Sequence, residues 1–277
     1  MTYIDDKGSI AKARSFCKLL HNKLPEEDKS FTELIYEFDT KIKGKHPNIT
    51  REALSNAHGD WYEWLLAISA WNYFSENSKS YLAITLPNIR RLDVSSLYIN
   101  ELYNQIKDLR EKIKKATSVN LVTSNPDFVI LDPKKINLNR SNYGIVTRVD
   151  EEVIDRLNSA YLSFVDKCGF EGIVGYLSSK LSFRPDRRLQ IAHEGSLIKA
   201  LYIHLQTRQW IISPKGLKYY AAAAKVKNSD REALKTVATH SITTVHDIPS
   251  AAVDEVFKID SITEAYEVYN DILIRPD

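Results

Sequence analysis

The sequence predicts an α/β fold in which a central mixed β-sheet is flanked by helices. Short β-rich runs alternate with longer amphipathic runs along the chain, a pattern typical of layered α/β proteins. The chain has 277 residues, which is enough to bury a sizeable core, and its 43% hydrophobic and 27% charged content is ordinary for a globular protein. We therefore expect a single domain over residues 1–277, with a helical N-terminal part (1–58) and a larger core (59–277).

The N-terminal part is predicted to be helical. Apolar side chains recur at helical spacing over residues 9–23 and 29–43, with Pro25 between the two runs. Next comes Gly59-Asp60, followed by an aromatic-rich run (61–74), and Asp60 is well placed to cap the N-terminus of a helix. The tryptophans of that run have the spacing of a helix face that packs in a core.

Strands and helices then alternate through the middle of the chain. Residues 81–86 predict a strand, and residues 95–115 predict a long amphipathic helix with a charged outer face. Two β-rich pieces follow at 119–123 and 127–131, and a polar, turn-rich loop follows at 132–148.

The C-terminal half continues the alternation. A helix at about 150–166 leads to a strand over 173–183, and a helix over 185–207 comes next. The remaining expected elements are strands at 217–225 and 234–239, a helix from about Pro249 and a helix over 263–273.

Composition excludes several classes of protein. The net charge of +2 provides no global basic field, so a nucleic-acid partner would need a local positive surface. Neither a run of about 20 apolar residues nor a secretory signal occurs, so we expect a cytoplasmic protein without a membrane partner. Cys17 and Cys168 lack metal-type spacing, the histidines lack zinc-hydrolase spacing, and there is no glycine-rich phosphate loop.

The most informative segment, residues 180–194, reads K-L-S-F-R-P-D-R-R-L-Q-I-A-H-E. Pro185 favours a helix start, because its missing N–H has no role in the first turn. Arginine forks match the guanine O6 and N7 acceptors of the major groove, and aspartate can accept from the cytosine amine. Taken alone, clustered arginines more often form a solvated, ion-paired surface. The side chains expected at the tip of this helix are Arg184, Asp186 and Arg187.

Glu63, Asp127, Lys180 and Glu194 are the candidate chemical groups. Asp127 follows Pro126 at the start of an apolar strand, where its side chain should be presented at the strand end. Carboxylates held close together suit Mg²⁺, which takes oxygen ligands and activates water. A neighbouring lysine can orient that water and offset developing negative charge. Singly, Asp127 is also a plausible strand cap and Glu63 a plausible partner for a basic side chain.

Several longer segments together point to one nuclease family. They are G-D-W-Y-E-W-L (59–65), S-N-P-D-F (124–128), S-K-L-S-F-R-P-D-R-R-L-Q-I-A-H-E-G-S-L-I-K-A-L-Y (179–202), H-L-Q-T-R-Q-W (204–210), Y-Y-A-A-A-A (219–224) and L-K-T-V-A-T-H-S-I-T (234–243). The chain resembles the type II restriction endonucleases that cut Pu-CCGG-Py, a CCGG-reading branch of the PD-(D/E)XK nucleases. The resemblance covers most of the chain from about residue 59, and its R-P-D-R-R…H-E-G block is the most specific part.

The resemblance implies a PD-(D/E)XK restriction-endonuclease-like fold and Mg²⁺-dependent hydrolysis of both strands of a CCGG-containing palindrome. By position, Asp127 and Glu194 look like the metal ligands, Lys180 like the catalytic lysine and Glu63 like a further acidic member. The wider superfamily has an acidic residue two positions before the lysine, where this chain has Ser178. In the resembling branch, Glu194 supplies the missing carboxylate from the following helix.

The resemblance also implies the contacts with double-stranded DNA. Arg184, Asp186 and Arg187 would read C·G pairs, and Asn56 resembles the family's minor-groove contact. Arg208, at the end of the long helix, suits a phosphate contact. A palindromic target calls for a two-fold homo-oligomer, at least a dimer. Trp210 resembles the contact that joins two such dimers into a tetramer, although a core tryptophan would explain it equally well.

Two other functions fit the same residues. One is a sequence-specific DNA-binding protein that does not cut, and the other is a structure-specific repair nuclease of the same superfamily. The sequence leaves open the outer bases of the site, the number of metal ions and whether two DNA sites are engaged together.

Overall fold

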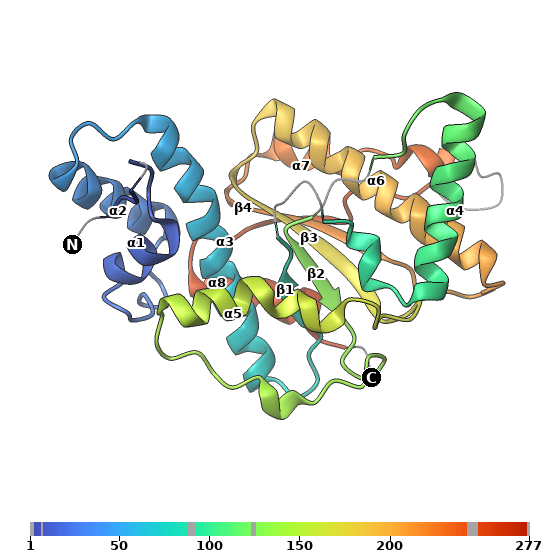
Figure 1. The fold of residues 1–277 in the computed structure, drawn as a ribbon, viewed down its shortest axis with the longest axis horizontal. Coiled ribbons are helices and arrows are strands. Elements are labelled where there is room, and N and C mark those ends of the chain that lie inside the picture. Colours follow the sequence, from blue (N-terminus) through green and yellow to red (C-terminus); the bar gives the residue numbers. More distant parts are fainter. Residues whose placement is uncertain (1–2, 7, 88–91, 123–125, 243–248, 276–277) are drawn as a thin grey trace.

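A five-stranded sheet lies at the centre of the molecule and helices cover both of its faces (Figure 1). The computed structural model describes residues 3–6, 8–87, 92–122, 126–242 and 249–275. The strands are β1 (Leu82–Thr85), β2 (Phe128–Leu131), β3 (Ile173–Ser182), β4 (Lys218–Lys225) and β5 (Glu255–Lys258), and they lie side by side in chain order. Because β1, β2 and β3 pair antiparallel while β3, β4 and β5 pair parallel, the expected mixed sheet is confirmed.

The two faces of the sheet carry separate hydrophobic clusters. Successive side chains of a strand point to opposite faces, so Phe128 and Ile130 join one cluster while Val129 and Leu131 join the other. On the first face the main helices are α3 (Arg51–Glu76) and α8 (Ile262–Leu273), and on the second they are α4 (Asn100–Thr117) and α6 (Pro185–Arg208). The remaining helices are α1 (Lys12–Leu19), α2 (Phe31–Lys45), α5 (Glu151–Ser159), α7 (Asn228–Leu234) and the 3-10 turns η1 (Val94–Leu97), η2 (Arg140–Asn142), η3 (Ala160–Phe164) and η4 (Thr239–Ile242).

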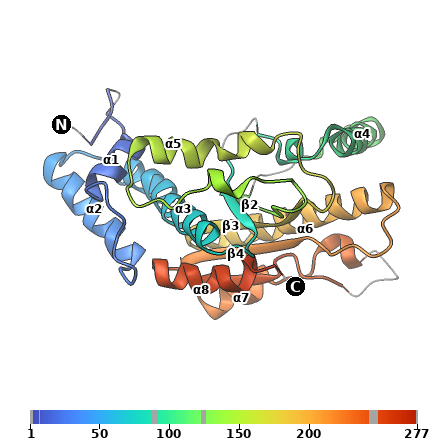
Figure 2. The same ribbon diagram turned by 90° about the horizontal axis from the view of Figure 1, so that it is seen from below.

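The N-terminal helices pack against α3 at one end of the molecule (Figure 1 and Figure 2). The expected start of α3 at Asp60 is wrong. The helix begins at Arg51, and the hydroxyl of Thr50 caps it by accepting from the backbone N–H of Ala53 at 3.1 Å. Leu54 and Ala57 are buried in the same cluster as α1 and α2, so tertiary packing extends the helix through Gly59. The boundary drawn between residues 58 and 59 therefore lies inside a continuous helix.

Two of the predicted strands are wrong. Residues 119–122 form no regular structure, and residue 123 lies outside the described residues. Residues 234–239 are not a strand either, since α7 occupies residues up to Leu234; the fifth strand is β5, where a helix from about Pro249 was expected. The reason is topological: parallel strands need a crossover connection, and the segment containing α7 carries the chain from the end of β4 back to the start of β5.

Other predictions from the sequence are confirmed with small shifts. The expected helix from residue 95 consists of η1 followed by α4, and the polar segment 132–148 is a loop apart from η2. That loop is anchored to α3, because Asn72 and Val146 exchange two hydrogen bonds of 2.9 and 2.7 Å. No helix within the described ranges is long and apolar enough to cross a membrane.

Candidate active site

A cleft of about 590 Å³ opens where α3, the end of β3 and the start of α6 meet. The three elements come from distant parts of the chain, and the sheet brings them together. Five residues singled out in the sequence line this cleft: Asn56, Glu63, Lys180, Arg184 and Arg187.

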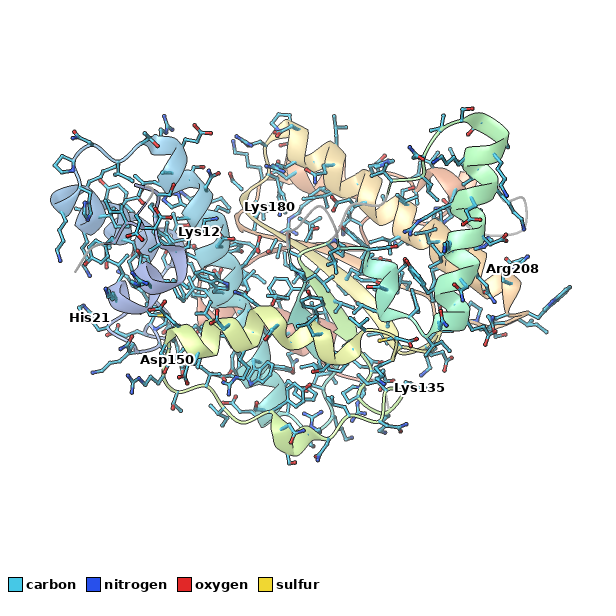
Figure 3. All side chains as sticks on the ribbon, viewed as in Figure 1. Lys12, His21, Lys135, Asp150, Lys180 and Arg208 are labelled. Carbon is cyan, nitrogen blue, oxygen red and sulfur yellow. The ribbon has the colours of Figure 1, made fainter. Side chains whose placement is uncertain are left out.

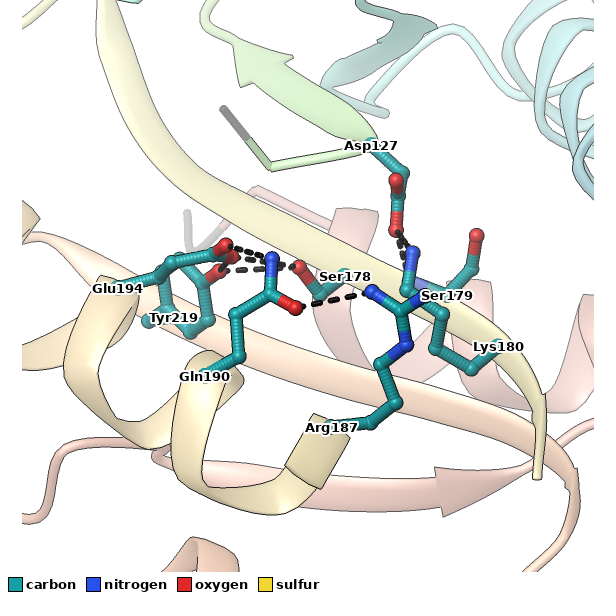
Figure 4. Close-up of polar contacts among 8 residues, drawn as sticks. All are labelled: Asp127, Ser178, Ser179, Lys180, Arg187, Gln190, Glu194 and Tyr219. Carbon is teal, nitrogen blue, oxygen red and sulfur yellow. Dashed lines mark hydrogen bonds and ion pairs between the residues drawn. The ribbon is translucent and has the colours of Figure 1, made fainter. Parts of the chain in front are cut away.

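Lys180 and Asp127 form the central contact of the site. Asp127 directly precedes β2, and the antiparallel pairing of Phe128 with Leu177 places its side chain beside β3. Its Oδ2 accepts a hydrogen bond from the backbone N–H of Ser179 at 2.6 Å and from Lys180 Nζ at 2.8 Å (Figure 4). Burial acts to lower the pKa of Lys180, but the charges of Asp127 and Glu63 outweigh it and raise that pKa. Lys180 is therefore an ammonium ion at neutral pH.

Glu194 reaches the same strand from α6 and is only 3% exposed. Its Oε2 accepts from the Tyr219 hydroxyl at 2.9 Å and from Ser178 Oγ at 3.4 Å, and its Oε1 accepts from Gln190 Nε2 at 2.9 Å (Figure 4). Burial, and next the charge of Glu194, raise the pKa of Tyr219 well above its usual value, so this hydroxyl stays protonated and can donate. Asp127 and Glu194 thus contact adjacent residues of β3, Ser179 and Ser178.

Glu63 joins this cluster electrostatically. Burial raises the pKa of Glu63 well above its usual value, and the negative charge of Asp127 raises it further, while Lys180 acts in the opposite direction. Lys180 therefore faces more than one carboxyl group. The cluster would gain from additional positive charge.

The donor set fits Mg²⁺. Asp127 and Glu194 are buried carboxylates that offer hard oxygen ligands. Over the part of the chain that the structure describes, no group of three or more His, Cys, Asp or Glu side chains is arranged to hold a metal ion. Mg²⁺ commonly keeps several waters and binds through one or two carboxylates and a substrate phosphate.

At the tip of α6, the neighbouring residues Arg187 and Arg188 point in different directions. Pro185 occupies the first turn as expected, and Arg184, Asp186 and Arg187 are partly or largely exposed there. Arg188 instead turns back to α7, where its Nη1 donates to the buried carboxylate of Asp230 at 3.0 Å. The tip therefore presents three polar side chains, while Arg188 joins α6 to α7.

Asp127, Asp186 and Glu194 are not among the residues that line the cleft, although Asp127 contacts Lys180, which does. Two other residues singled out in the sequence lie farther away. Arg208 is at the opposite end of α6, a helix of 24 residues that spans about 36 Å, and it pairs with Asp108 at 3.9 Å. Figure 3 labels Arg208 and Lys180 in different parts of the molecule. Trp210 follows that end of the helix and is 88% exposed, so the alternative of a core tryptophan is wrong.

The sequence interpretation missed the side chains that hold Glu194. Tyr219 was expected only as part of a strand; it is buried, and its hydroxyl contacts Glu194. Gln190 stands four residues before Glu194 and three after Arg187, spacings that bring side chains together on a helix, so it could have been found. The ion pair between Lys12 of α1 and Asp60 of α3 also lies at the cleft, and nothing in the local sequence indicates it.

The chain is similar to known restriction endonucleases. The chain matches the family model described as Cfr10I/Bse634I restriction endonuclease over residues 7–275. It is 44% identical over 254 residues to the type II restriction enzyme Cfr10I of Citrobacter freundii, covering 86% of this chain and 88% of that protein.

The solved structures that resemble this chain include two of the Bse634I restriction endonuclease. The one with cognate DNA has a TM-score of 0.87 and 29% identity, covering 97% of this chain and 95% of that one. The other has a TM-score of 0.86 and 30% identity, covering 95% and 92%. The expected restriction-endonuclease-like fold is thereby confirmed. The chain belongs to the Cfr10I/Bse634I family of type II restriction endonucleases, which are site-specific deoxyribonucleases.

Proposed function

We propose that this enzyme cuts both strands of a CCGG-containing palindrome of the form Pu-CCGG-Py, using Mg²⁺. The observation that carries the proposal is that α6 joins two kinds of group. Its exposed tip bears Arg184, Asp186 and Arg187, and its third turn bears Glu194, which contacts β3 beside Lys180 and Asp127. A relative, Bse634I, has been solved with its cognate DNA, which supports DNA as the partner here.

In this proposal Asp127 and Glu194 hold the metal ion. When bound, Mg²⁺ supplies positive charge that stabilises the phosphate and makes a water molecule a better nucleophile. Lys180, held by Asp127 at 2.8 Å, orients the attacking water and offsets the charge that develops on the phosphate. Glu63 lines the same cleft, and its ionised form raises the pKa of Lys180.

Recognition is assigned to both walls of the cleft. Arg184 and Arg187 present planar forks suited to guanine, and Asp186 between them can accept from a cytosine amine. Asn56 lies on α3, across the cleft from the tip of α6, where it could reach the minor groove. Arg208, far from this cleft, has no part in this proposal and stays a separate prediction.

The assembly is proposed to be a homo-oligomer. A palindrome presents two identical half-sites, so two copies related by a two-fold axis would each cut one strand. Trp210 and Ile212 form an exposed apolar pair after α6, 88% and 94% exposed, which supports a further contact between dimers and hence a tetramer. The cytoplasmic location of the enzyme also stays a prediction.

The test is a plasmid digest with and without Mg²⁺, followed by run-off sequencing of the ends. Discrete fragments that end within one CCGG-containing sequence are expected, and only when Mg²⁺ is present. A smear, or cutting at branched DNA, would support the repair-nuclease alternative. Specific binding without any cut would support the non-cleaving alternative.

A further inference from the structure

Gln190 bridges the two functional parts of α6. Arg187 Nη1 donates to Gln190 Oε1 at 2.9 Å, and Gln190 Nε2 donates to Glu194 Oε1 at 2.9 Å (Figure 4). The three residues lie on one helix face at spacings of three and four. A single carboxamide therefore contacts a proposed base-reading arginine with its oxygen and a proposed metal ligand with its nitrogen.

The two oxygens of Glu194 are held in different ways. Oε2 accepts from Tyr219 and Ser178, which are buried side chains on central strands of the sheet. Oε1 accepts from Gln190, an exposed side chain with several rotatable bonds. The contacts to Oε2 can therefore persist while Gln190 moves, and Oε1 is the oxygen that a cation can gain most easily.

A cation at Oε1 and the Gln190 amide compete for the same place. The amide nitrogen presents its positively polarised hydrogens to that oxygen, so a metal ion there must displace it or be repelled by it. Arg187 orients the amide in the blocking position by donating to its other end. Once Arg187 turns toward a guanine, it no longer donates to Gln190, and the amide can leave Oε1.

We propose that Gln190 is a positioning residue that couples base recognition by Arg187 to metal binding by Glu194. This rests on the proposed function, because it takes Glu194 as a metal ligand and Arg187 as a reader of bases. In the free enzyme the Gln190 amide blocks Oε1 of Glu194. When the enzyme binds the correct DNA sequence, the amide leaves that oxygen. Since coupling between binding sites is reciprocal, the metal ion in turn favours the correct DNA over other sequences.

The test measures metal binding and not cleavage. Ca²⁺, another hard cation with oxygen ligands, is titrated by calorimetry into the free enzyme, the enzyme on a CCGG duplex and the enzyme on a scrambled duplex. The wild-type enzyme should bind Ca²⁺ about tenfold more tightly on the CCGG duplex than on the scrambled one, a typical strength of coupling. Gln190→Met keeps the side-chain length and removes both hydrogen bonds. It should tighten Ca²⁺ binding to the free enzyme several-fold and reduce the difference between the two duplexes.

A matched control uses the same helix and the same substitution. Gln206 lies near the far end of α6, where its Nε2 donates to the backbone carbonyl of Ile211. Gln206→Met should leave all three Ca²⁺ affinities as in the wild-type enzyme. Thermal melting of each variant checks that the fold is kept.

Two results for Gln190→Met would overturn the inference. The first is that all three Ca²⁺ affinities equal those of the wild-type enzyme. The second is that the free variant binds Ca²⁺ more weakly, which would mean that Gln190 supports Glu194 as a metal ligand and does not block it. Glu194→Gln separates this failure from that of the proposed function. If Glu194→Gln binds Ca²⁺ as well as the wild-type enzyme does, the ligand assignment itself is wrong. If it loses binding while Gln190→Met does not differ from wild type, only the coupling is wrong.

Discussion

At the scale of single residues, the site depends on one buried ion pair. Lys180 and Asp127 are 53 residues apart in sequence, yet Nζ and Oδ2 lie 2.8 Å apart. Asp127 is buried and Lys180 is mostly buried, so each charge is stabilised by the other, and the carboxylate also accepts from the backbone N–H of Ser179. Such a pair is preorganised for electrostatic work, because it needs no rearrangement when substrate arrives.

Replacing Lys180 should therefore stop the reaction without preventing DNA binding. Lys180→Ala should lower the single-turnover cleavage rate by at least about 10²–10³-fold, the usual effect of removing one preorganised charge-stabilising group. Lys225→Ala is the control, since Lys225 is an exposed lysine at the end of the adjacent strand. Wild-type cleavage by Lys180→Ala would show that the catalytic assignment is wrong.

Glu63 should make stability depend on pH. Its pKa is raised in the folded enzyme, first by burial and then by the charge of Asp127, so the folded state holds a proton that the unfolded chain releases. The unfolding free energy must then fall as pH rises above the usual glutamate range and toward the raised pKa. Glu63→Gln cannot ionise, so its Tm should fall less than that of the wild type between pH 5 and pH 8. If the Tm of both enzymes falls equally over that pH range, the assignment is contradicted.

At the scale of elements, α6 is both the helix proposed to read bases and a structural helix. Arg187 faces the cleft, whereas Arg188 contacts the buried Asp230 of α7. The same helix packs closely on the sheet at Gly195, where an added Cβ would lie 2.2 Å from the carbonyl oxygen of Ala252 and 2.9 Å from the Tyr219 ring. Sequence neighbours on α6 therefore have different tasks.

The two arginines should separate binding from stability. Arg187→Ala should weaken binding to the CCGG duplex by about 1–3 kcal/mol and leave Tm unchanged. Arg188→Ala should instead lower the unfolding free energy by about 1–3 kcal/mol, because it leaves the Asp230 carboxylate buried without this partner. Titration calorimetry and thermal melting of both variants check the pair. The assignment fails if the two variants exchange these effects.

Gly195→Ala should destabilise the enzyme by about 1–3 kcal/mol, because backbone atoms must move to accept the methyl group. Since Tyr219 is displaced as well, its contact with Glu194 should weaken and cleavage should slow. Gly59→Ala is the control, because a Cβ at Gly59 of α3 would meet nothing within 4 Å. It should stabilise the helix by up to about 1 kcal/mol. Equal stability of the two variants would contradict the packing argument.

At the scale of the whole molecule, the places where charged and exposed apolar side chains gather matter more than the net charge. A net charge of +2 says little about DNA binding, but Lys12, Lys180, Arg184 and Arg187 gather around one cleft. The end of α6 away from that cleft carries the exposed Trp210. One end of α6 is therefore suited to DNA and the other to a second copy of the chain.

Trp210→Ala should reduce a tetramer to a dimer. Removing the exposed indole takes away most of the apolar area that this corner offers to another copy. Sedimentation velocity measures the change, and Tyr36→Ala provides the control, since Tyr36 is an exposed aromatic on α2. If the Trp210 variant sediments as the wild type does, this corner is not an interface.

Periodicity and turn residues determined most of the elements. Pro185 marks the start of α6, and the expected strand at 217–225 is β4. The same local signals failed where long-range packing decides. Asp60 has the chemistry of a helix cap, but α3 continues past it, and the short β5 depends on a partner strand that the local sequence does not reveal.

The sequence by itself predicted the residue types of the site and its metal chemistry, and it indicated the family to which the chain is similar. Tertiary structure decided which groups meet: Asp127 with Lys180 through strand pairing, Glu194 with Tyr219 and Ser178 through the packing of α6 on the sheet, and Gln190 with both Arg187 and Glu194. The physical reason is that side-chain periodicity is a local property, which a single chain segment displays. Contacts between distant segments depend on strand order and helix packing, which only the folded chain specifies.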